Sequence, residues 1–145
     1  TQLVVFGTSE PDPRLDFGFD VSYLGSLDNY SLALAYSAAD VFVMPSMEDN
    51  LPLTVLESLA CKTPVVSFDI DGMLDVMAHE QTGYLAKSFD TDDLAKGIMW
   101  VLDDPVRQKQ LGEIGRERIE KGFTHENQAD AYVKLYEKIL TESNQ

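Results

Sequence analysis

The stretch VFVMPSMEDNLPLTVLE, residues 41–57, carries the local signals of a strand, a loop and a helix in direct succession. Four apolar residues predict a buried strand over residues 41–44, and a polar loop follows Pro45. Pro52 is favoured at the first position of a helix, so the spacing predicts a helix over residues 53–61. A strand that leads directly into a helix is half of a βαβ unit, which indicates a parallel sheet.

The same alternation extends in both directions from this stretch. Apolar runs predict strands over residues 3–6, 21–24, 64–68 and 84–86, and helix-period patterns predict helices over residues 30–39 and 73–78. No linker or internal repeat divides the chain. We therefore expect one α/β domain, residues 1–145, with a Rossmann-like parallel sheet flanked by helices.

After Asp90 the strands stop and helical patterns continue, so residues 88–145 are predicted to form a helical tail. Trp100 is expected to anchor this tail on the sheet. The last helix carries an apolar stripe of Tyr132, Val133, Leu135, Tyr136, Ile139 and Leu140.

The run over residues 3–6 predicts a strand buried on both faces, although nothing precedes it that would pair with it or cover it. Unpaired strand edges invite pairing with other chains. Either this strand is an edge of the sheet, or the chain is part of a longer one and lacks an upstream strand; we favour the second explanation.

The charge of the chain limits its partners. Eleven basic and 25 acidic residues give a formal net charge of −14, which repels nucleic acid and anionic lipid, so no nucleic-acid partner is expected. Only Arg14 and Lys62 are basic among residues 1–86. Cys61 is the single cysteine and cannot form an internal disulfide, which fits a reducing compartment and a cytoplasmic location.

A phosphate site is predicted at the start of the helix over residues 53–61. Ligands of open parallel sheets bind at the carboxyl ends of the strands. The N–H groups of Leu53 and Thr54 and the positive end of the helix dipole attract a phosphate without a lysine. Glu57 lies one turn further on, where it is placed to accept hydrogen bonds from vicinal hydroxyls such as those of a ribose.

The same residues have ordinary structural explanations. Asp49 or Asn50 before a helix can be an N-cap, and Glu57 can be a solvated helix residue. His79 and His125 share no metal-ligand spacing, so we expect loop or cap roles for them and no metal site.

The run ADVFVMPSMEDNLPLTVLESLACKTPVVSFDIDGMLDVMAHEQTGYLA, residues 39–86, resembles the donor-binding half of a retaining GT-B glycosyltransferase of the group-1 or family-4 type. The matching pieces are Ala-Asp before a strand, Pro-Ser after it, and two acids with seven residues between them, Asp49 and Glu57. They continue with the LESLAC helix, the TPVV strand and a turn at Gly72. A looser likeness extends from Leu3 to the final helix.

The resemblance implies that a nucleotide-sugar donor, a UDP- or GDP-sugar, binds in a cleft between two domains, of which this chain is the C-terminal one. Glu57 would hold the ribose hydroxyls and Asp49 the hydroxyls of the transferred sugar. The expected catalytic residues are thus Asp49 and Glu57, and the expected substrate-binding residues are Leu24, Gly25, Glu48, Asn50, Leu51, Leu53, Thr54 and Gly72.

Four departures from the family pattern affect these assignments. The first acid is usually Glu, so Glu48 is the alternative to Asp49 if the loop shifts by one residue. Pro52 stands where glycine is frequent and removes one amide donor. Asp71-Gly72 replaces a glycine pair, so the sugar preference does not transfer. The family's upstream strand with its basic diphosphate clamp, and its acceptor domain, are absent from this sequence.

The resemblance also implies transfer with retention and without a bound metal or other cofactor, in bacterial cell-surface polysaccharide synthesis. The acceptor, a sugar or lipid-linked sugar, would bind to the missing N-terminal domain, and the isolated chain would be inactive. The enzyme would act in the cytoplasm or in peripheral association with the inner face of the membrane. The alternative is a non-catalytic acidic α/β binding or signalling module, although no acid directly follows Phe6 as a receiver domain requires.

Overall fold

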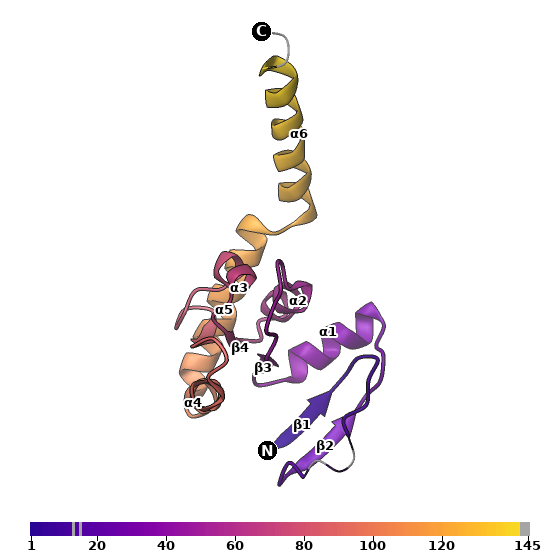
Figure 1. Cartoon of the computed structure of the whole chain (residues 1–145), viewed down its shortest axis with the longest axis vertical. Coiled ribbons are helices and arrows are strands. Elements are labelled where there is room, and N and C mark those ends of the chain that lie inside the picture. The colour runs from indigo at the N-terminus through magenta and orange to yellow at the C-terminus, as the bar shows by residue number, and fades with distance from the viewer. Residues whose placement is uncertain (13, 15, 143–145) are drawn as a thin grey trace. The chain divides into compact units, whose positions relative to one another are not determined.

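The computed structural model describes residues 1–12, 14 and 16–142, which form two compact units, Thr1–Ala35 and Tyr36–Gln145 (Figure 1). The strands are β1 (Gln2–Val5), β2 (Asp20–Tyr23), β3 (Phe42–Met44), β4 (Val65–Phe68) and β5 (Gly83–Ala86). The helices are α1 (Asn29–Ala38), α2 (Leu53–Ala60), α3 (Asp71–Val76), α4 (Thr91–Leu102), α5 (Pro105–Gly122) and α6 (His125–Glu142). Every predicted strand and helix is present, with its ends within two residues of the prediction.

The first unit contains a parallel pair of strands, β1 and β2, in which Gln2 pairs with Asp20 and Val5 with Tyr23. Among the described residues β1 has no second neighbour, and its residues alternate between exposed and half-buried, with Val4 45% exposed. Within this unit β1 is therefore an edge strand with one half-buried face, and the expectation that an upstream strand of a longer chain pairs with it stays a prediction.

The second unit contains a parallel sheet in the order β3-β4-β5. All residues of β4 and β5 are buried. Because side chains alternate along a strand, Val65 and Val66 enter different clusters on the two faces of the sheet. The parallel α/β fold is thus confirmed, but the strands form two sheets, one in each unit, where the sequence predicted one. Local patterns identify strands and leave open which of them pair.

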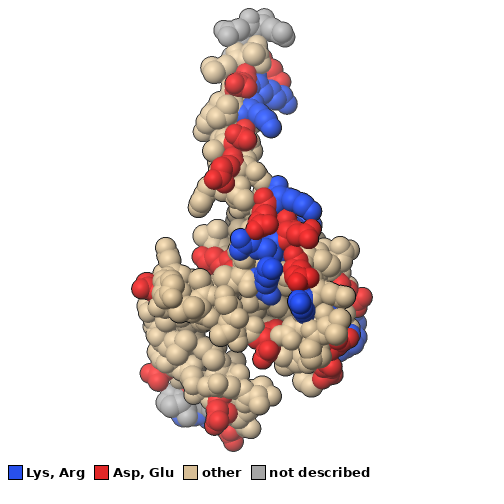
Figure 2. Space-filling view, turned by 180° about the vertical axis from the view of Figure 1, so that it is seen from behind, with Lys and Arg blue, Asp and Glu red and all other residues tan. Residues whose placement is uncertain are grey.

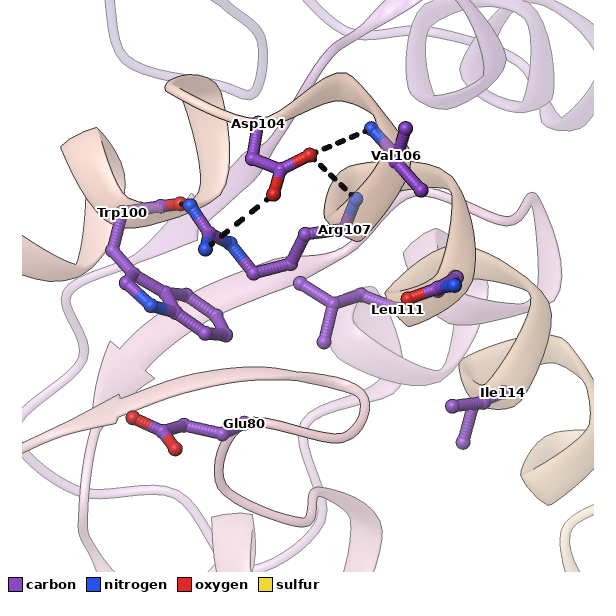
Figure 3. Close-up of a pocket in the computed structure, with 8 residues that line it drawn as sticks. Glu80, Trp100, Asp104, Val106, Arg107, Leu111 and Ile114 are labelled. Carbon is purple, nitrogen blue, oxygen red and sulfur yellow. Dashed lines mark hydrogen bonds and ion pairs between the residues drawn. The ribbon is translucent and has the colours of Figure 1, made fainter.

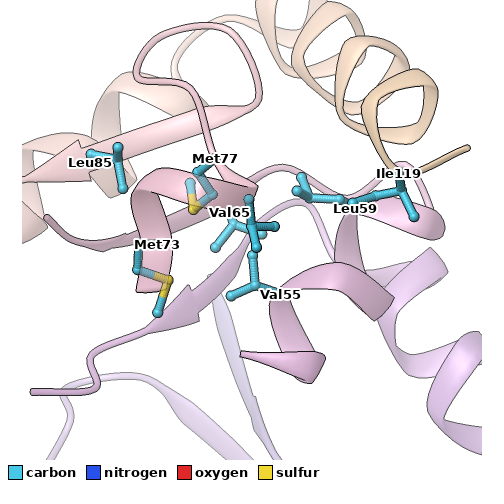
Figure 4. Close-up of a cluster of buried hydrophobic side chains, with 8 residues drawn as sticks. Val55, Leu59, Val65, Met73, Met77, Leu85 and Ile119 are labelled. Atoms are coloured by element: carbon cyan, nitrogen blue, oxygen red, sulfur yellow. The ribbon is translucent and has the colours of Figure 1, made fainter. Parts of the chain in front are cut away.

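Helices α2, α3 and α5 cover one face of the three-stranded sheet. Figure 4 shows the cluster that they form with β4 and β5, in which Val55, Leu59, Val65, Met73 and Ile119 are buried. This packing fixes the position of α2, and therefore of the loop that precedes it, relative to the strands.

Helix α4 is held on the other face by the tail tryptophan, as predicted. The Trp100 ring lies 5.8 Å from the ring of Tyr84 on β5, and Tyr84 is 5% exposed. Helix α6 buries none of its residues, and all six members of its predicted apolar stripe are exposed. None of the described helices combines the length and apolar composition that a membrane span requires.

Helix α5 approaches the end of α2 through a glycine. A Cβ atom at Gly112 would lie 2.1 Å from the carbonyl oxygen of Lys62, which no side chain accommodates. Gly122 lies in the same helix and has nothing within 4 Å of a Cβ position.

We expect Gly112→Ala to lower the free energy of unfolding by about 1–3 kcal/mol, the usual cost of overpacking, even though alanine favours helix. Gly122→Ala is the matched control and should leave stability unchanged or raise it. Urea denaturation of both variants measures the difference, and a Gly112→Ala protein as stable as the parent would contradict the α2–α5 packing.

Candidate functional site

The loop between β3 and α2 and the start of α3 lie together at the carboxyl edge of the sheet. The backbone N–H of Gly72 in α3 donates to the carbonyl oxygen of Asp49 over 3.2 Å. The structure therefore brings together three residues that the sequence placed in the site, namely Asp49, Asn50 and Gly72.

Gly72 packs against the loop without space for a side chain. A Cβ atom at this position would lie 2.1 Å from the carbonyl oxygen of Asp49 and 2.6 Å from that of Asn50. Because the contact is made by backbone atoms on both sides, it fixes the path of the loop rather than the rotamer of one side chain.

The loop is also held by its own hydrogen bonds. The carboxylate of Asp49 accepts from the N–H of Leu51 over 3.0 Å, and the Ser46 hydroxyl donates to the carbonyl oxygen of Glu48 over 3.0 Å. The N-cap of α2 is Pro52, and no side chain caps this helix. The explanation of Asp49 or Asn50 as an N-cap is therefore wrong, because Asp49 serves a turn that ends before the helix begins.

The first backbone N–H groups of α2 remain available. Among the described residues, the N–H groups of Leu53 and Thr54 have no hydrogen-bond acceptor. Leu53 is 63% exposed, and Leu51 and Asn50 beside it are exposed as well. A helix N-terminus with unsatisfied donors and a positive dipole end attracts anions.

Glu57 lies one turn further along α2, on an exposed position. Its Oε2 atom accepts a hydrogen bond from the hydroxyl of Tyr36 over 3.3 Å, whereas Oε1 has no partner among the residues that the structure describes. Burial, reinforced by the charge of Glu57, raises the pKa of Tyr36, so the phenol stays protonated and can donate. Sequence reasoning missed Tyr36, because no spacing rule relates it to Glu57.

The two remaining candidates, Leu24 and Gly25, belong to the unit Thr1–Ala35 and are described within that unit alone. They follow β2. The N–H of Leu24 donates to the carbonyl oxygen of Val5, and the carbonyl oxygen of Gly25 accepts from the N–H of Gly7, each over 2.9 Å. Gly25 has a φ of +67°, a backbone conformation that favours glycine.

Acidic side chains dominate the sequence around the loop, and basic side chains are concentrated elsewhere. Glu48, Asp49, Glu57, Asp69 and Asp71 lie on or next to the elements just described. On the face shown in Figure 2, basic side chains gather over the helices of the C-terminal half. An anion at the start of α2 would therefore be held by backbone N–H groups.

A cavity of about 360 Å³ lies away from this loop, between α4, α5 and the loop before β5 (Figure 3). Two of its charged groups contact each other: the Arg107 guanidinium lies 4.2 Å from the Trp100 ring centre, donates to the Trp100 carbonyl oxygen and pairs with Asp104 over 3.7 Å. None of the candidate residues lines this cavity. Its geometry is that of a helix–helix junction.

The histidine in the loop before β5 has a structural role, as predicted. The Nδ1 atom of His79 accepts from the N–H of Leu85 over 3.1 Å, and its ring lies 4.7 Å from that of Tyr84. In the described part of the chain, no group of three or more His, Cys, Asp or Glu residues is arranged to hold a metal ion.

Comparison with known proteins identifies the fold and the family. The chain matches the family described as Glycosyl transferases group 1 over residues 14–118. Alpha-maltose-1-phosphate synthase from Mycolicibacterium smegmatis is 33% identical over 120 residues, 78% of this chain and 31% of that protein. Sucrose-phosphate synthase from Thermosynechococcus elongatus has a TM-score of 0.84 and 31% identity over 97% of this chain and 39% of that chain. HepE from Anabaena in complex with UDP and glucose has a TM-score of 0.76 and 17% identity over 92% of this chain and 40% of that chain.

The fold is therefore that of a GT-B glycosyltransferase domain. The chain belongs to the family Glycosyl transferases group 1. It spans about a third of the length of the first curated relatives that it matches.

The contact between Gly72 and the loop predicts a local effect of substitution. Gly72→Ala should displace the backbone of residues 49–50, lower the free energy of unfolding by about 1–3 kcal/mol and accelerate amide hydrogen exchange over residues 46–52. Leu74→Ala is the control on the same helix, because Leu74 is exposed. Hydrogen exchange followed by mass spectrometry measures both variants, and unchanged exchange in Gly72→Ala would show that the loop is held by other contacts.

Proposed function

We propose that this chain binds the donor substrate of a retaining glycosyltransferase, and that the intact enzyme transfers a sugar from a UDP- or GDP-sugar to an acceptor. The observation that carries the proposal is the start of α2. There, two N–H groups lie one turn before the Glu57 carboxylate, and among the described residues neither these N–H groups nor one of the carboxylate oxygens has a partner. Family membership supports the same assignment. The diphosphate would bind to the N–H groups of Leu53 and Thr54, and the ribose hydroxyls would donate to Glu57.

The transferred sugar is assigned to the loop that precedes α2. Asp49 or Glu48 would accept hydrogen bonds from its hydroxyls, and the backbone of residues 50–51 beside Gly72 would line its position. Asp49 already accepts from Leu51 through Oδ1, which fixes its carboxylate, whereas Glu48 is exposed and has no side-chain partner among the described residues. We favour Asp49, because a fixed carboxylate loses less conformational freedom on binding. Leu24 and Gly25 are proposed for the base on the resemblance alone.

In the proposed reaction, the bond between the anomeric carbon and the diphosphate oxygen breaks while the acceptor oxygen bonds to that carbon on the same face. The proton of the acceptor hydroxyl passes to the leaving diphosphate, so the products are the glycoside and the nucleoside diphosphate. Negative charge grows on the diphosphate during this step. The N–H groups at the start of α2 would therefore bind the transition state more strongly than the donor, which is the condition for catalysis.

The proposal assigns no metal or other cofactor to this step and no nucleic acid to the site. The acceptor, a sugar or lipid-linked sugar, is assigned to a part of the protein outside this chain. We place the reaction in bacterial cell-surface polysaccharide synthesis, in the cytoplasm or at the inner face of the membrane, as the family resemblance implies.

Replacing the carboxylate of Glu57 tests the site directly. In the full-length protein, Glu57→Gln should weaken binding of UDP or GDP by about 10- to 150-fold, because a charge-assisted hydrogen bond to the ribose is lost. The melting temperature should change little, since Glu and Gln have similar helix propensities. Glu113→Gln is the matched control, an exposed glutamate on α5 without a hydrogen bond among the described residues. Isothermal titration calorimetry measures the affinities, and a Glu57→Gln protein that binds like the parent would overturn the assignment.

The same measurements, combined with turnover, distinguish the two candidates for the first acid. Asp49→Asn keeps an oxygen for the Leu51 N–H and should lower turnover more than nucleotide affinity, because the side chain is assigned to the transferred sugar. Glu48→Gln should leave both nearly unchanged. A loss of turnover in Glu48→Gln but not in Asp49→Asn would assign the sugar to Glu48. If Glu57→Gln, Asp49→Asn and Glu48→Gln lose only stability, a non-catalytic module is favoured.

A further inference from the structure

The partner of Glu57 is a tyrosine hydroxyl buried at the end of α1. Tyr36 is 1% exposed, and its hydroxyl lies 3.3 Å from Glu57 Oε2, whereas Oε1 of the same carboxylate has no partner in the part of the chain that the structure describes. Because the residue that donates this hydrogen bond is buried, the contact is not an incidental surface pairing. It leaves one carboxylate oxygen directed to the protein and one available to a ligand.

Tyr36 itself is held from two directions. Its ring meets the ring of Phe42 on β3 edge-on, with centroids 5.2 Å apart at 88°. Its carbonyl oxygen accepts a 2.6 Å hydrogen bond from the hydroxyl of Thr63, which is 2% exposed. The phenol therefore has little freedom to follow a moving carboxylate.

Thr63, which donates to the Tyr36 carbonyl oxygen, also forms hydrogen bonds with α2 next to Glu57. The carbonyl oxygen of Thr63 accepts from the hydroxyl of Ser58 over 3.1 Å, and the Thr63 N–H donates to the Ser58 carbonyl oxygen over 3.0 Å. Ser58 follows Glu57 directly in the chain and is completely buried. These buried hydrogen bonds thus join the backbone that carries Glu57 to the backbone of Tyr36, whose phenol contacts the Glu57 side chain.

We infer that Tyr36 is a positioning residue that orients the Glu57 carboxylate toward the nucleotide of the donor. This inference rests on the proposed function of Glu57 and adds a residue that does not itself touch the ligand. A glutamate on an exposed helix surface samples several rotamers, and each hydrogen bond that it makes to a ligand must first overcome that freedom. The hydrogen bond from Tyr36 limits this freedom before the donor arrives.

The test removes only the hydroxyl. Tyr36→Phe keeps the ring and its edge contact with Phe42, and in the full-length protein it should weaken binding of UDP and GDP by about three- to tenfold, the effect of one hydrogen bond of rather long geometry. Turnover at saturating donor should stay within about twofold of the parent, because the orientation of Glu57 affects binding of the nucleotide rather than the transfer step.

The matched control is Tyr84→Phe. Tyr84 is also a buried tyrosine, and its hydroxyl donates to a carboxylate oxygen of Asp93 over 3.0 Å. Tyr84 lies on β5 and Asp93 on α4, and neither residue is part of the candidate site. Both variants should lower the melting temperature by similar amounts, while only Tyr36→Phe changes nucleotide affinity. Equal losses of affinity in the two variants would show that both act through general stability, and would overturn the inference.

A double-mutant cycle with Glu57→Ala separates this inference from the proposed function. If Tyr36 acts through Glu57, Tyr36→Phe changes affinity by less than about twofold once Glu57 is alanine. A loss that persists in the Glu57→Ala background, or no loss in the single variant while Glu57→Ala weakens binding, refutes the positioning role and leaves Glu57 as a ligand. If Glu57→Ala binds UDP and GDP like the parent, the proposed function fails, and the role of Tyr36 fails with it.

Discussion

The backbone contact between Gly72 and the carbonyl groups of Asp49 and Asn50 is the constraint on which the site depends. It joins the loop that follows β3 to the start of α3, which follows the adjacent parallel strand β4. The contact leaves no space for a side chain at Gly72. Because α3 is buried through Met73 and Val76, the loop before α2 is tied to the core of the unit rather than only to its own turn. The start of α2 therefore presents its N–H groups from a fixed position.

An acidic chain can bind an anion where backbone N–H groups are held in a fixed position. The residues around the loop supply carboxylates, and the phosphate would be held by backbone dipoles, which carry no net charge and need no ordering of long side chains. In the proposed function, the carboxylates would accept hydrogen bonds from the hydroxyl groups of the donor. Backbone donors for the diphosphate and side-chain acceptors for the hydroxyl groups would together allow an acidic site to bind a negatively charged donor.

The strands and helices were predictable from the sequence, because they carry apolar runs or helix-period patterns and several of them have a proline or glycine at one end. The pairing of the strands was not predictable from the sequence, because β1 and β2 carry the same local signals as β3 to β5 and yet form a separate sheet. Within the site, Pro52 correctly located the start of α2, but the role of Asp49 in a turn and the contact between Tyr36 and Glu57 depend on distances between segments. A spacing in the sequence contains no information on such distances.

We propose that a nucleoside diphosphate binds to the N–H groups at the start of α2. A titration of UDP and GDP into the full-length protein, labelled with ¹⁵N in leucine, threonine and tryptophan, tests this through the amide and indole resonances. We expect saturable shifts of the Leu53 and Thr54 amides, with the Trp100 indole resonance unchanged. Shifts at Trp100 with Leu53 and Thr54 unmoved would place the ligand in the α4–α5 cavity and overturn the proposal.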